Sequence, residues 1–292
     1  MIDPRDWLFL ILLAILWGAS YFFAGVAVRE LPPLTIVLAR VALAAAILVP
    51  VHWLLRGALP GDLKSWMPFI GMSIFNNVIP FSLIVTGQTQ IASGLASVLN
   101  ATTPLFAVII MATSGDEKLI ARKLLGIAIG LAGVIILRGE STMEGKTIGI
   151  ALCLAAALSY GFAGLWGRRW LAGIPPLTSA TCQLICSSVI VALLAGTFEQ
   201  PWRLRMPSIA AWSALLGFAA LSTALAYIVF FQILARSGAA NVMLVTLLVP
   251  VTAIFLGYFI LDEPLHPREI IGAIVIASSL LIIDGRVLRF FR

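Results

Sequence analysis

Charge is scarce in this chain, and its scarcity excludes most soluble folds. Only 11% of the 292 residues are Asp, Glu, Lys or Arg, whereas a soluble domain carries about 25%. Hydrophobic residues make up 61% of the chain, and the mean hydropathy is +1.07. Water cannot solvate a surface so poor in charge, so lipid is predicted to be the solvent. The composition therefore indicates an integral membrane protein.

Residues that commonly carry catalysis or bind metals are also few. Cys153, Cys182 and Cys186 lie within apolar segments, which argues against a disulfide framework or a thiolate metal site. His52 and His266 show no ligand spacing. The sequence has no phosphate loop, and no carboxylate stands in the middle of an apolar run. We therefore expect no enzyme, no metal and no cofactor. The net charge of +6 forms no basic stripe, so no nucleic-acid partner is expected either.

Long apolar runs are what the chain does contain. Each is about 20 residues long, enough for a helix to cross the hydrocarbon core of ~30 Å. The first run lacks a clear cleavage site and is interpreted as a retained helix. Ten spans are predicted, at residues 6–28, 33–55, 65–87, 91–113, 119–138, 146–168, 176–197, 207–233, 238–261 and 267–286.

The chain is internally duplicated. Pro104 falls on Pro250, and Asp116-Glu117 falls on Asp262-Glu263, at a constant offset of 146. The Pro-Pro-Leu-Thr segment that begins at Pro32 recurs 143 residues later. Repeats of this kind decide the fold. The two Asp-Glu pairs fall in loops on opposite sides of the membrane, and we interpret them as solvated residues at helix ends.

Each repeat contains five spans, so the second copy enters the membrane from the opposite side. The predicted fold class is an all-α membrane protein of ten transmembrane helices, built as two inverted-topology five-helix repeats. The first repeat covers residues 1–139, an external linker covers 140–145, and the second repeat covers 146–292. Inverted repeats are typical of transporters that work by alternating access around a site near the midplane. A non-transporting membrane scaffold is the alternative.

The basic residues favour one orientation. With the N-terminus in the cytoplasm, 12 Lys and Arg residues lie inside and six lie outside. This excess places both termini in the cytoplasm of a bacterial inner-membrane protein. Arg40 was left out of the count because it lies well inside a span. It could bind a substrate carboxylate, but we favour a structural role, in which it snorkels or binds backbone carbonyls.

Several short motifs identify a family. They are Trp17-Gly18, the Pro-Pro-Leu-Thr entry to the second span with Arg40 after it, the stretch from Ser93 to Pro104, the two Asp-Glu loops, and Gly126 with Gly272. Over nearly its whole length the chain resembles the EamA family of the drug/metabolite transporter superfamily. The resemblance implies a carrier whose cavity is lined mainly by spans one, three, four, six, eight and nine. Within the family the chain is most similar to exporters of aromatic amino acids and some cationic drugs.

Polar residues inside the spans are candidates for a substrate site. Asn76 and Asn77 in the third span match Ser222 and Thr223 in the eighth, again at an offset of 146. Asn100 stands in the middle of the fourth span. A polar side chain at this depth needs a partner or water. Hydrogen bonding between helices is the alternative to cavity lining.

Three prolines are predicted to act as hinges. Pro80, Pro104 and Pro250 lie inside spans. Each removes the hydrogen bond to the carbonyl four residues earlier, which permits a bend. All three freed carbonyls belong to polar residues, Asn76, Asn100 and Thr246.

Aromatic side chains complete the predicted site, because rings suit planar or cationic ligands. Core or lipid-facing packing is the alternative for each ring. The predicted substrate-binding residues are Trp17, Tyr21, Asn76, Asn77, Asn100, Trp166, Tyr227 and Thr246.

Small residues indicate how the halves join. Gly126, Gly130 and Gly133 in the fifth span and Gly272 in the tenth would let these two helices pack closely. We therefore expect a functional monomer in the lipid bilayer, with a homodimer as the alternative.

The predicted function is export of amino acids, aromatic ones foremost, and of related amphipathic metabolites or drugs. The alternatives are an importer or a carrier of another small metabolite, such as a nucleotide-sugar-like solute. No carboxylate inside a span offers a route for proton coupling.

Overall fold

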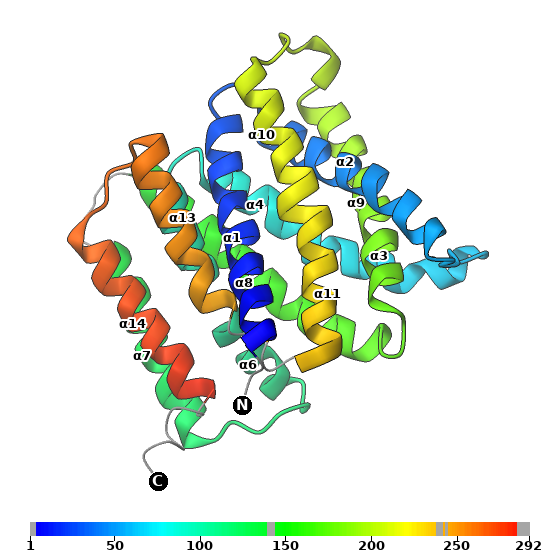
Figure 1. Cartoon of the computed structure of the whole chain (residues 1–292). Helices are drawn as coiled ribbons and strands as arrows, with labels where there is room; N and C mark the ends of the chain where they lie inside the picture. Colours follow the sequence, from blue (N-terminus) through cyan, green and yellow to red (C-terminus); the bar gives the residue numbers. More distant parts are fainter. Residues whose placement is uncertain (1–3, 139–143, 238–241, 243–244, 285–292) are drawn as a thin grey trace.

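The computed structural model describes residues 4–138, 144–237, 242 and 245–284, and every regular element in those ranges is a helix (Figure 1). Most of the predicted linker and the arginines after residue 284 lie outside the described residues. In the described ranges the helices run in ten membrane-crossing segments that follow the predicted spans to within a few residues, except that most of the predicted start of the ninth span, 238–244, lies outside the described residues. The predicted all-helical fold of ten spans is therefore confirmed.

The first repeat contains five crossing segments. These are α1 (Pro4–Ala27); α2 (Pro33–Leu54); the third span, made of η1 (Leu63–Trp66), α3 (Met67–Ser73), η2 (Ile74–Val78) and α4 (Ile79–Gly87); the fourth, made of α5 (Ser93–Asn100) and α6 (Thr103–Thr113); and α7 (Ala121–Arg138).

The second repeat has the same plan. Its segments are α8 (Glu144–Trp170); α9 (Pro176–Phe198), followed by the short η3 (Pro201–Arg203); the eighth span, made of α10 (Ile209–Ala219), η4 (Ala220–Leu225) and α11 (Ala226–Ser237); α13 (Val245–Leu261); and α14 (Pro267–Asp284).

Seven of these segments are long and apolar enough by composition to cross a membrane, and α13 is a shorter apolar helix. The other two, α7 and α14, have 18 residues each and carry charges near their ends. Helices α2 and α9 each have a proline in the first turn. Proline is favoured there because the N–H that it lacks would have no hydrogen-bond partner within the helix. The Pro-Pro pairs in the sequence therefore mark equivalent helix starts in the two repeats.

Two ends of the bundle serve as landmarks below. Helix α1 begins and α14 ends at the same end of the bundle, which we name the terminal end (Figure 1). The opposite end, where α1 leads into α2 and α9 leads into α10, we name the cap end. An even number of crossings returns the chain to the end at which it started.

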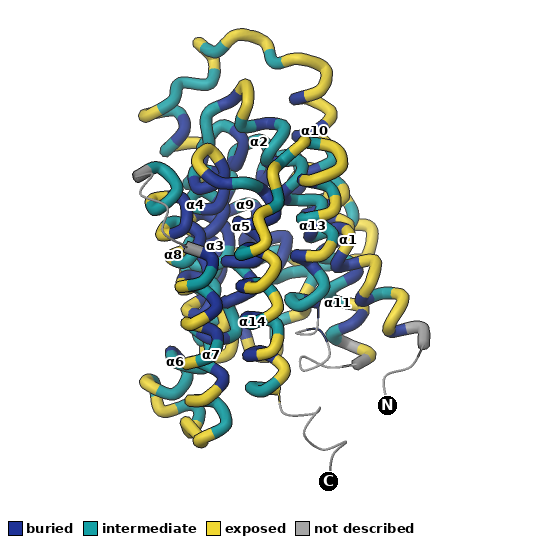
Figure 2. The backbone as a smooth tube through the Cα atoms, turned by 90° about the vertical axis from the view of Figure 1, so that its left-hand side faces the viewer, coloured by how far each residue is buried: buried dark blue, intermediate teal, exposed yellow. Residues whose placement is uncertain are grey.

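The repeats interlock instead of standing side by side. Helix α1 packs against α13, and α2 packs against α9, so each pair joins one helix from each repeat. Both large clusters of buried apolar side chains draw on both repeats. The outer faces of the helices stay exposed, as the outer surface in Figure 2 shows, and there they meet lipid. The interior between the repeats is where polar groups are shielded from that lipid.

The predicted contact between the fifth and tenth spans is confirmed. Helices α7 and α14 lie side by side at the edge of the bundle. A Cβ atom added to Gly133 would lie 3.2 Å from the Gly272 carbonyl oxygen, and one added to Gly272 would lie 3.1 Å from the Gly133 oxygen. Only glycine permits two helix backbones to approach so closely. This pair joins the last helix of each repeat within one chain.

Candidate functional site

Two π-helical segments interrupt equivalent spans. They are η2 in the third span and η4 in the eighth, and their first residues, Ile74 and Ala220, are 146 positions apart. In η4 the Thr223 hydroxyl donates to the Phe218 carbonyl, five residues earlier, at 2.9 Å. Pro80 follows η2, but Ala226 holds the matched place after η4, so proline is not required for the distortion. Single π turns inside α-helices are frequent at functional sites.

The matched polar residues lie in these segments and bond across the repeat interface. Asn76 Nδ2 donates to Gln183 Oε1 at 2.9 Å and to the Tyr227 hydroxyl at 3.3 Å. Asn77 Nδ2 donates to Ser187 Oγ at 2.9 Å, and the Tyr227 hydroxyl donates to Asn77 Oδ1 at 3.2 Å. We name these five residues the amide cluster. It brings together three of the predicted site residues with Gln183 and Ser187, which were not predicted.

Arg40 is buried at the equivalent place in the other repeat. Its Nε donates to Thr223 Oγ1 at 3.0 Å. Its guanidinium carbon lies 3.5 Å from the ring centroid of Phe81 and 4.2 Å from that of Phe218. The side chain therefore does not snorkel to the membrane surface. Arg40 and Gln183 are 143 residues apart, the offset already seen in the Pro-Pro-Leu-Thr segments, so the sequence held the signal that links Arg40 to the amide cluster.

Tyr21 and Asn100 lie together beside this region. The Asn100 amide lies against the Tyr21 hydroxyl, and Asn100 Oδ1 is buried with no hydrogen-bond partner among the residues that the structure describes. Gln88 Nε2 donates to the Tyr21 carbonyl at 2.9 Å, which ties α1 to the end of α4. Tyr21 is also close enough to Arg40 to interact with it electrostatically. Tyr21 therefore links Asn100 to the Arg40 side of the site.

The three prolines predicted as hinges lie at different places in their helices. Pro104 lies in the first turn of α6, after a break at residues 101–102. The carbonyl of Asn100 that it frees accepts a hydrogen bond from Thr103 Oγ1 at 2.7 Å, so it is already occupied. Pro80 lies in the first turn of α4, and Pro250 lies inside α13. Two of the three predicted hinges thus fall where one helix ends and the next begins.

The two tryptophans lie apart from each other. Trp17 packs on Phe230, with 5.6 Å between ring centroids, beside the core cluster that includes Tyr21. Trp166 Nε1 donates to the Pro68 carbonyl at 2.9 Å, and its ring contacts Phe75. Phe75 precedes Asn76 in the chain. Trp17 therefore borders the Tyr21 side of the site, and Trp166 borders η2 through Phe75.

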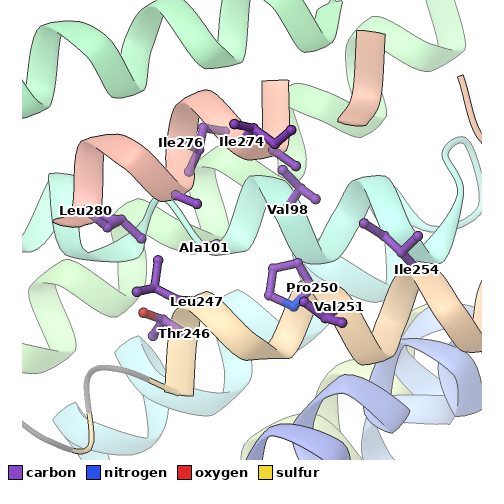
Figure 3. A pocket seen from close by; sticks show the side chains of 12 residues that line it. Val98, Ala101, Thr246, Leu247, Pro250, Val251, Ile254, Ile274, Ile276 and Leu280 are labelled. Carbon is purple, nitrogen blue, oxygen red and sulfur yellow. The ribbon is translucent and has the colours of Figure 1, made fainter. Parts of the chain in front are cut away.

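Thr246 lies in a separate pocket. This cavity of about 180 Å³ is formed by α5, α13 and α14, and Pro250 also lines it (Figure 3). Most of its other lining side chains are aliphatic, including Val251 and Ile274 at its exposed rim. The structure does not bring Thr246 into contact with the amide cluster.

Three glutamates close the cap end. Glu199 accepts from the Leu34 and Thr35 N–H groups at 2.9 and 2.6 Å. Glu263 accepts from Ser93 N and Oγ at 2.9 and 2.8 Å. These carboxylates satisfy N–H groups in the first turns of α2 and α5, which have no partner inside their own helices.

Glu30 makes the third cap, where it accepts from Ser208 N and Oγ at 2.8 and 2.5 Å. The hydrogen bonds from the Ser208 hydroxyl and N–H lower the pKa of Glu30. In all three caps the glutamate belongs to one repeat and the capped helix to the other. The cap end is therefore closed by bonds between the repeats.

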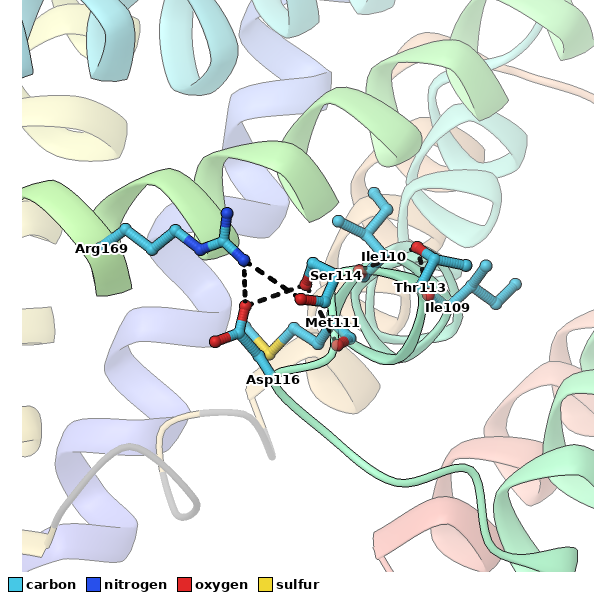
Figure 4. Close-up of polar contacts among 7 residues, drawn as sticks. All are labelled: Ile109, Ile110, Met111, Thr113, Ser114, Asp116 and Arg169. Atoms are coloured by element: carbon cyan, nitrogen blue, oxygen red, sulfur yellow. Dashed lines mark hydrogen bonds and ion pairs between the residues drawn. The ribbon is translucent and has the colours of Figure 1, made fainter.

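The prediction that the Asp-Glu pairs are merely solvated is wrong for three of the four residues, one of which, Glu117, pairs with Lys123. Glu263 caps α5, as described. Asp116, at the terminal end, accepts from Arg169 Nη2 at 2.7 Å and from Ser114 Oγ at 2.9 Å (Figure 4). These bonds, the one from Ser114 foremost, lower the pKa of Asp116. Hydrophobic patterning locates such loops but does not reveal a partner about 50 to 170 residues away.

The composition of the site is suited to binding a small ligand. Among the residues the structure describes, no group of three or more His, Cys, Asp or Glu side chains could hold a metal ion. The site instead joins amides, hydroxyls and one cation to neighbouring rings, at the interface of two inverted repeats. Transporter sites are built in this way.

The sequence pattern of the EamA-like transporter family matches residues 6–139 and again residues 147–284. The chain belongs to this family. The two matches cover its two five-helix repeats, so EamA-like membership and the duplication agree. Family membership points to a membrane transporter rather than an enzyme.

Similar EamA-like proteins carry transporter names. The uncharacterized transporter YoaV of Bacillus subtilis (strain 168) is 26% identical over 274 residues, covering 93% of this chain and 94% of that protein. The uncharacterized inner membrane transporter YedA of Escherichia coli (strain K12) is 28% identical, covering 92% and 88%. A crystal structure of a protein with 18% sequence identity matches with a TM-score of 0.68 over 97% of this chain and 98% of the other. The fold is thus shared, and the protein is a multi-pass membrane transporter.

Proposed function

We propose that this transporter exports amino acids, aromatic ones foremost, together with related amphipathic metabolites or drugs, across a bacterial inner membrane. The observation that carries the proposal is the amide cluster. Asn76, Asn77 and Tyr227 lie inside or next to the two π-helical segments, and they bond to each other and to α9 of the opposite repeat. Polar groups in both repeats at matched depths are what an alternating-access site requires.

The surroundings fit a ligand with one charged end and one apolar end. Amide and hydroxyl oxygens accept hydrogen bonds from an ammonium group. Asn100 Oδ1 is a buried acceptor without a partner, and such an atom is stabilised by any donor that reaches it. Tyr21 lies beside Asn100, and Trp17 packs against the apolar cluster that includes Tyr21, so rings on which a planar side chain can stack border this side of the site. An aromatic amino acid meets both demands.

A nucleotide-sugar-like solute is the less favoured substrate. Its phosphates call for several basic groups, because each carries charge that must be neutralised. Arg40 is the only Lys or Arg that is buried among the described residues. One cation matches the single carboxylate of an amino acid better than it matches a diphosphate.

The orientation belongs to the same proposal. The excess of Lys and Arg at the terminal end supports an orientation with both termini in the cytoplasm. The three glutamate caps then face the outside. Export requires that the site open in turn to each side, so the caps and the Asp116–Arg169 pair must be broken at different stages of transport.

Reconstitution tests this proposal. Purified protein in liposomes is offered a panel of labelled solutes: phenylalanine, tryptophan, leucine, glycine, a quaternary ammonium compound and a uridine-diphosphate sugar. Protein-free liposomes are the control. We expect exchange of the aromatic amino acids at the highest rate, with leucine slower and glycine slowest. Transport of the nucleotide sugar alone, or of no solute in the panel, contradicts the proposal.

A further inference from the structure

We propose that Arg40 is the carboxylate-recognition residue of the transport site. This inference rests on the proposed function and specifies which end of the substrate is recognised, and where. The side chain is only 9% exposed, and it lies at the repeat interface, where its Nε bonds to Thr223 in η4.

Within the described part of the chain, Arg40 is a cation without a counterion. A guanidinium has five N–H donors, and the one hydrogen bond that Arg40 forms uses Nε. The terminal nitrogens have no hydrogen-bond acceptor among the described residues, and none of the ion pairs in this part of the chain includes Arg40. A buried charge left in this state is costly, and a paired one is not. The free donors therefore favour an anion that enters the site.

The contacts that Arg40 does make hold it in place without neutralising it. Phe81 and Phe218 offer their ring faces to the cation, which attracts the charge but supplies no hydrogen-bond acceptor. Thr223 fixes the Nε edge. A guanidinium held by these contacts presents its two terminal nitrogens together, and this fork matches the two oxygens of a carboxylate.

The other repeat provides an internal comparison. Gln183 occupies the position equivalent to Arg40, is neutral, and has its oxygen occupied by Asn76. The two equivalent positions thus differ in charge and in whether their hydrogen-bonding groups already have partners. Arg40 offers free N–H donors, whereas the Gln183 oxygen in the amide cluster already accepts a hydrogen bond and can accept a further one through its second lone pair. Tyr227 joins the two sides, since it bonds to Asn76 and Asn77 and interacts electrostatically with Arg40.

This asymmetry orients a zwitterion. The carboxylate of an α-amino acid lies at Arg40, and its ammonium group lies toward the acceptor oxygens of Asn100 and the amide cluster. Ser222 supports the assignment, because its hydroxyl is buried beside Thr223 without a partner. The substrate class that follows is a small solute with one carboxylate.

Competition binding tests the assignment. Labelled phenylalanine bound to purified protein is displaced by phenylalanine, by 3-phenylpropionate, which lacks the ammonium group, and by phenylalaninamide, which lacks the charged carboxylate. For the wild-type protein we expect the amide to bind at least about tenfold more weakly than phenylalanine, because it cannot form the charge-assisted pair. For Arg40→Gln we expect phenylalanine and its amide to bind equally. Arg40→Lys, which keeps the charge without the fork, should retain part of the preference.

The outcomes separate this inference from the proposed function. If Arg40→Gln transports phenylalanine and still prefers it to the amide, Arg40 is structural and the inference fails, while amino-acid transport stands. If the wild-type protein ignores amino acids but binds 3-phenylpropionate through Arg40, the anion site stands and the proposed substrate fails. If neither Arg40 variant folds, the test is the melting temperature of the wild-type protein in the presence of each of the three ligands. It must rise with phenylalanine and 3-phenylpropionate and not with phenylalaninamide, and equal stabilisation by all three overturns the inference.

Discussion

Arg40 and Thr223 are joined by a hydrogen bond of 3.0 Å that crosses the interface between the repeats. The equivalent bond joins Asn76 to Gln183 at 2.9 Å and crosses the same interface. Here the π-helical segment belongs to the first repeat and the second-span residue belongs to the second repeat. In each case a residue of the second span in one repeat meets a π-helical segment of the other. The inverted duplication therefore produces two related contacts at one site, and only one of them carries a charge.

The first prediction concerns the α7–α14 contact. Gly130→Leu should lower the free energy of unfolding by about 1–3 kcal/mol, because overpacking strains the neighbours. A Cβ atom at this position would lie 2.3 Å from Leu105 Cδ1 and 2.9 Å from Ser279 Oγ. Thermal unfolding in detergent measures the effect. Ala128→Leu, on an exposed position of the same helix, is the matched control and should be neutral. Equal stability of the two variants would mean that this face does not hold the helices together.

The second prediction concerns the caps. Glu199→Ala should destabilise the protein by about 0.5–2 kcal/mol, the usual effect of losing a helix cap, because Leu34 and Thr35 lose the acceptor for their N–H groups. Glu199→Gln keeps one side-chain oxygen as an acceptor and should recover part of the loss. Both are compared by thermal unfolding at neutral pH. If the alanine variant is as stable as the wild-type protein, the cap contributes nothing.

The third prediction concerns pH. The bonds from Ser208 lower the pKa of Glu30, so the ionised form is favoured in the folded state. Stability from this cap is then fully present above the ordinary glutamate pKa of about 4.3, and it is lost as the pH falls through the lowered folded-state value. Glu30→Gln lacks this titration. The gap in melting temperature between wild type and Glu30→Gln should be constant near neutral pH and should shrink under acidic conditions. A gap that widens on acidification is inconsistent with the cap.

How far the sequence predicted the structure depends on the range of the interaction. The helix limits near Pro33 and Pro176 were predicted because hydropathy and proline act within a few residues. The η4 distortion was not predicted, since no proline marks it and its bond from Thr223 to Phe218 is invisible in composition. The caps were missed for a related reason, because Glu199 and its partners are about 165 residues apart.

In the candidate site, too, the sequence predicted what depends on repeated or local patterns and missed what depends on contacts between distant residues. Asn76 and Asn77 were proposed from the repeat offset and Tyr227 as an aromatic lining residue, and the structure brings the three into contact. Gln183 stands 143 residues after Arg40, at the equivalent repeat position, but the contacts of the two side chains depend on how the repeats interlock. Thr246 was grouped with the others by its place before Pro250, yet it faces a different pocket. Helical periodicity gives the face of one helix and not the partner that covers it.

The fourth prediction concerns orientation. In a variant whose three cysteines are replaced by alanine, Thr89→Cys at the cap end and Lys118→Cys at the terminal end provide single labelling sites. Both positions are exposed. An impermeant maleimide added to intact, outer-membrane-permeabilised cells should label Thr89→Cys and leave Lys118→Cys unlabelled until the inner membrane is opened. The reverse pattern would place both termini outside and would contradict the proposed orientation.

The most direct test of the central claim, that the polar site at the repeat interface carries the substrate, is the rate of phenylalanine exchange by Asn100→Ala in liposomes. Among the described residues Asn100 Oδ1 has no hydrogen-bond partner, and the Asn100 amide lies against the Tyr21 hydroxyl, so Asn100→Ala should lower the melting temperature only slightly. Ser188→Ala, whose hydroxyl bonds only to its own helix at Leu184, is the matched control. The account predicts that Asn100→Ala folds as well as the control and exchanges phenylalanine at least about tenfold more slowly, as expected when a buried hydrogen bond to a charged group is lost. Exchange by Asn100→Ala at the control rate would contradict the account.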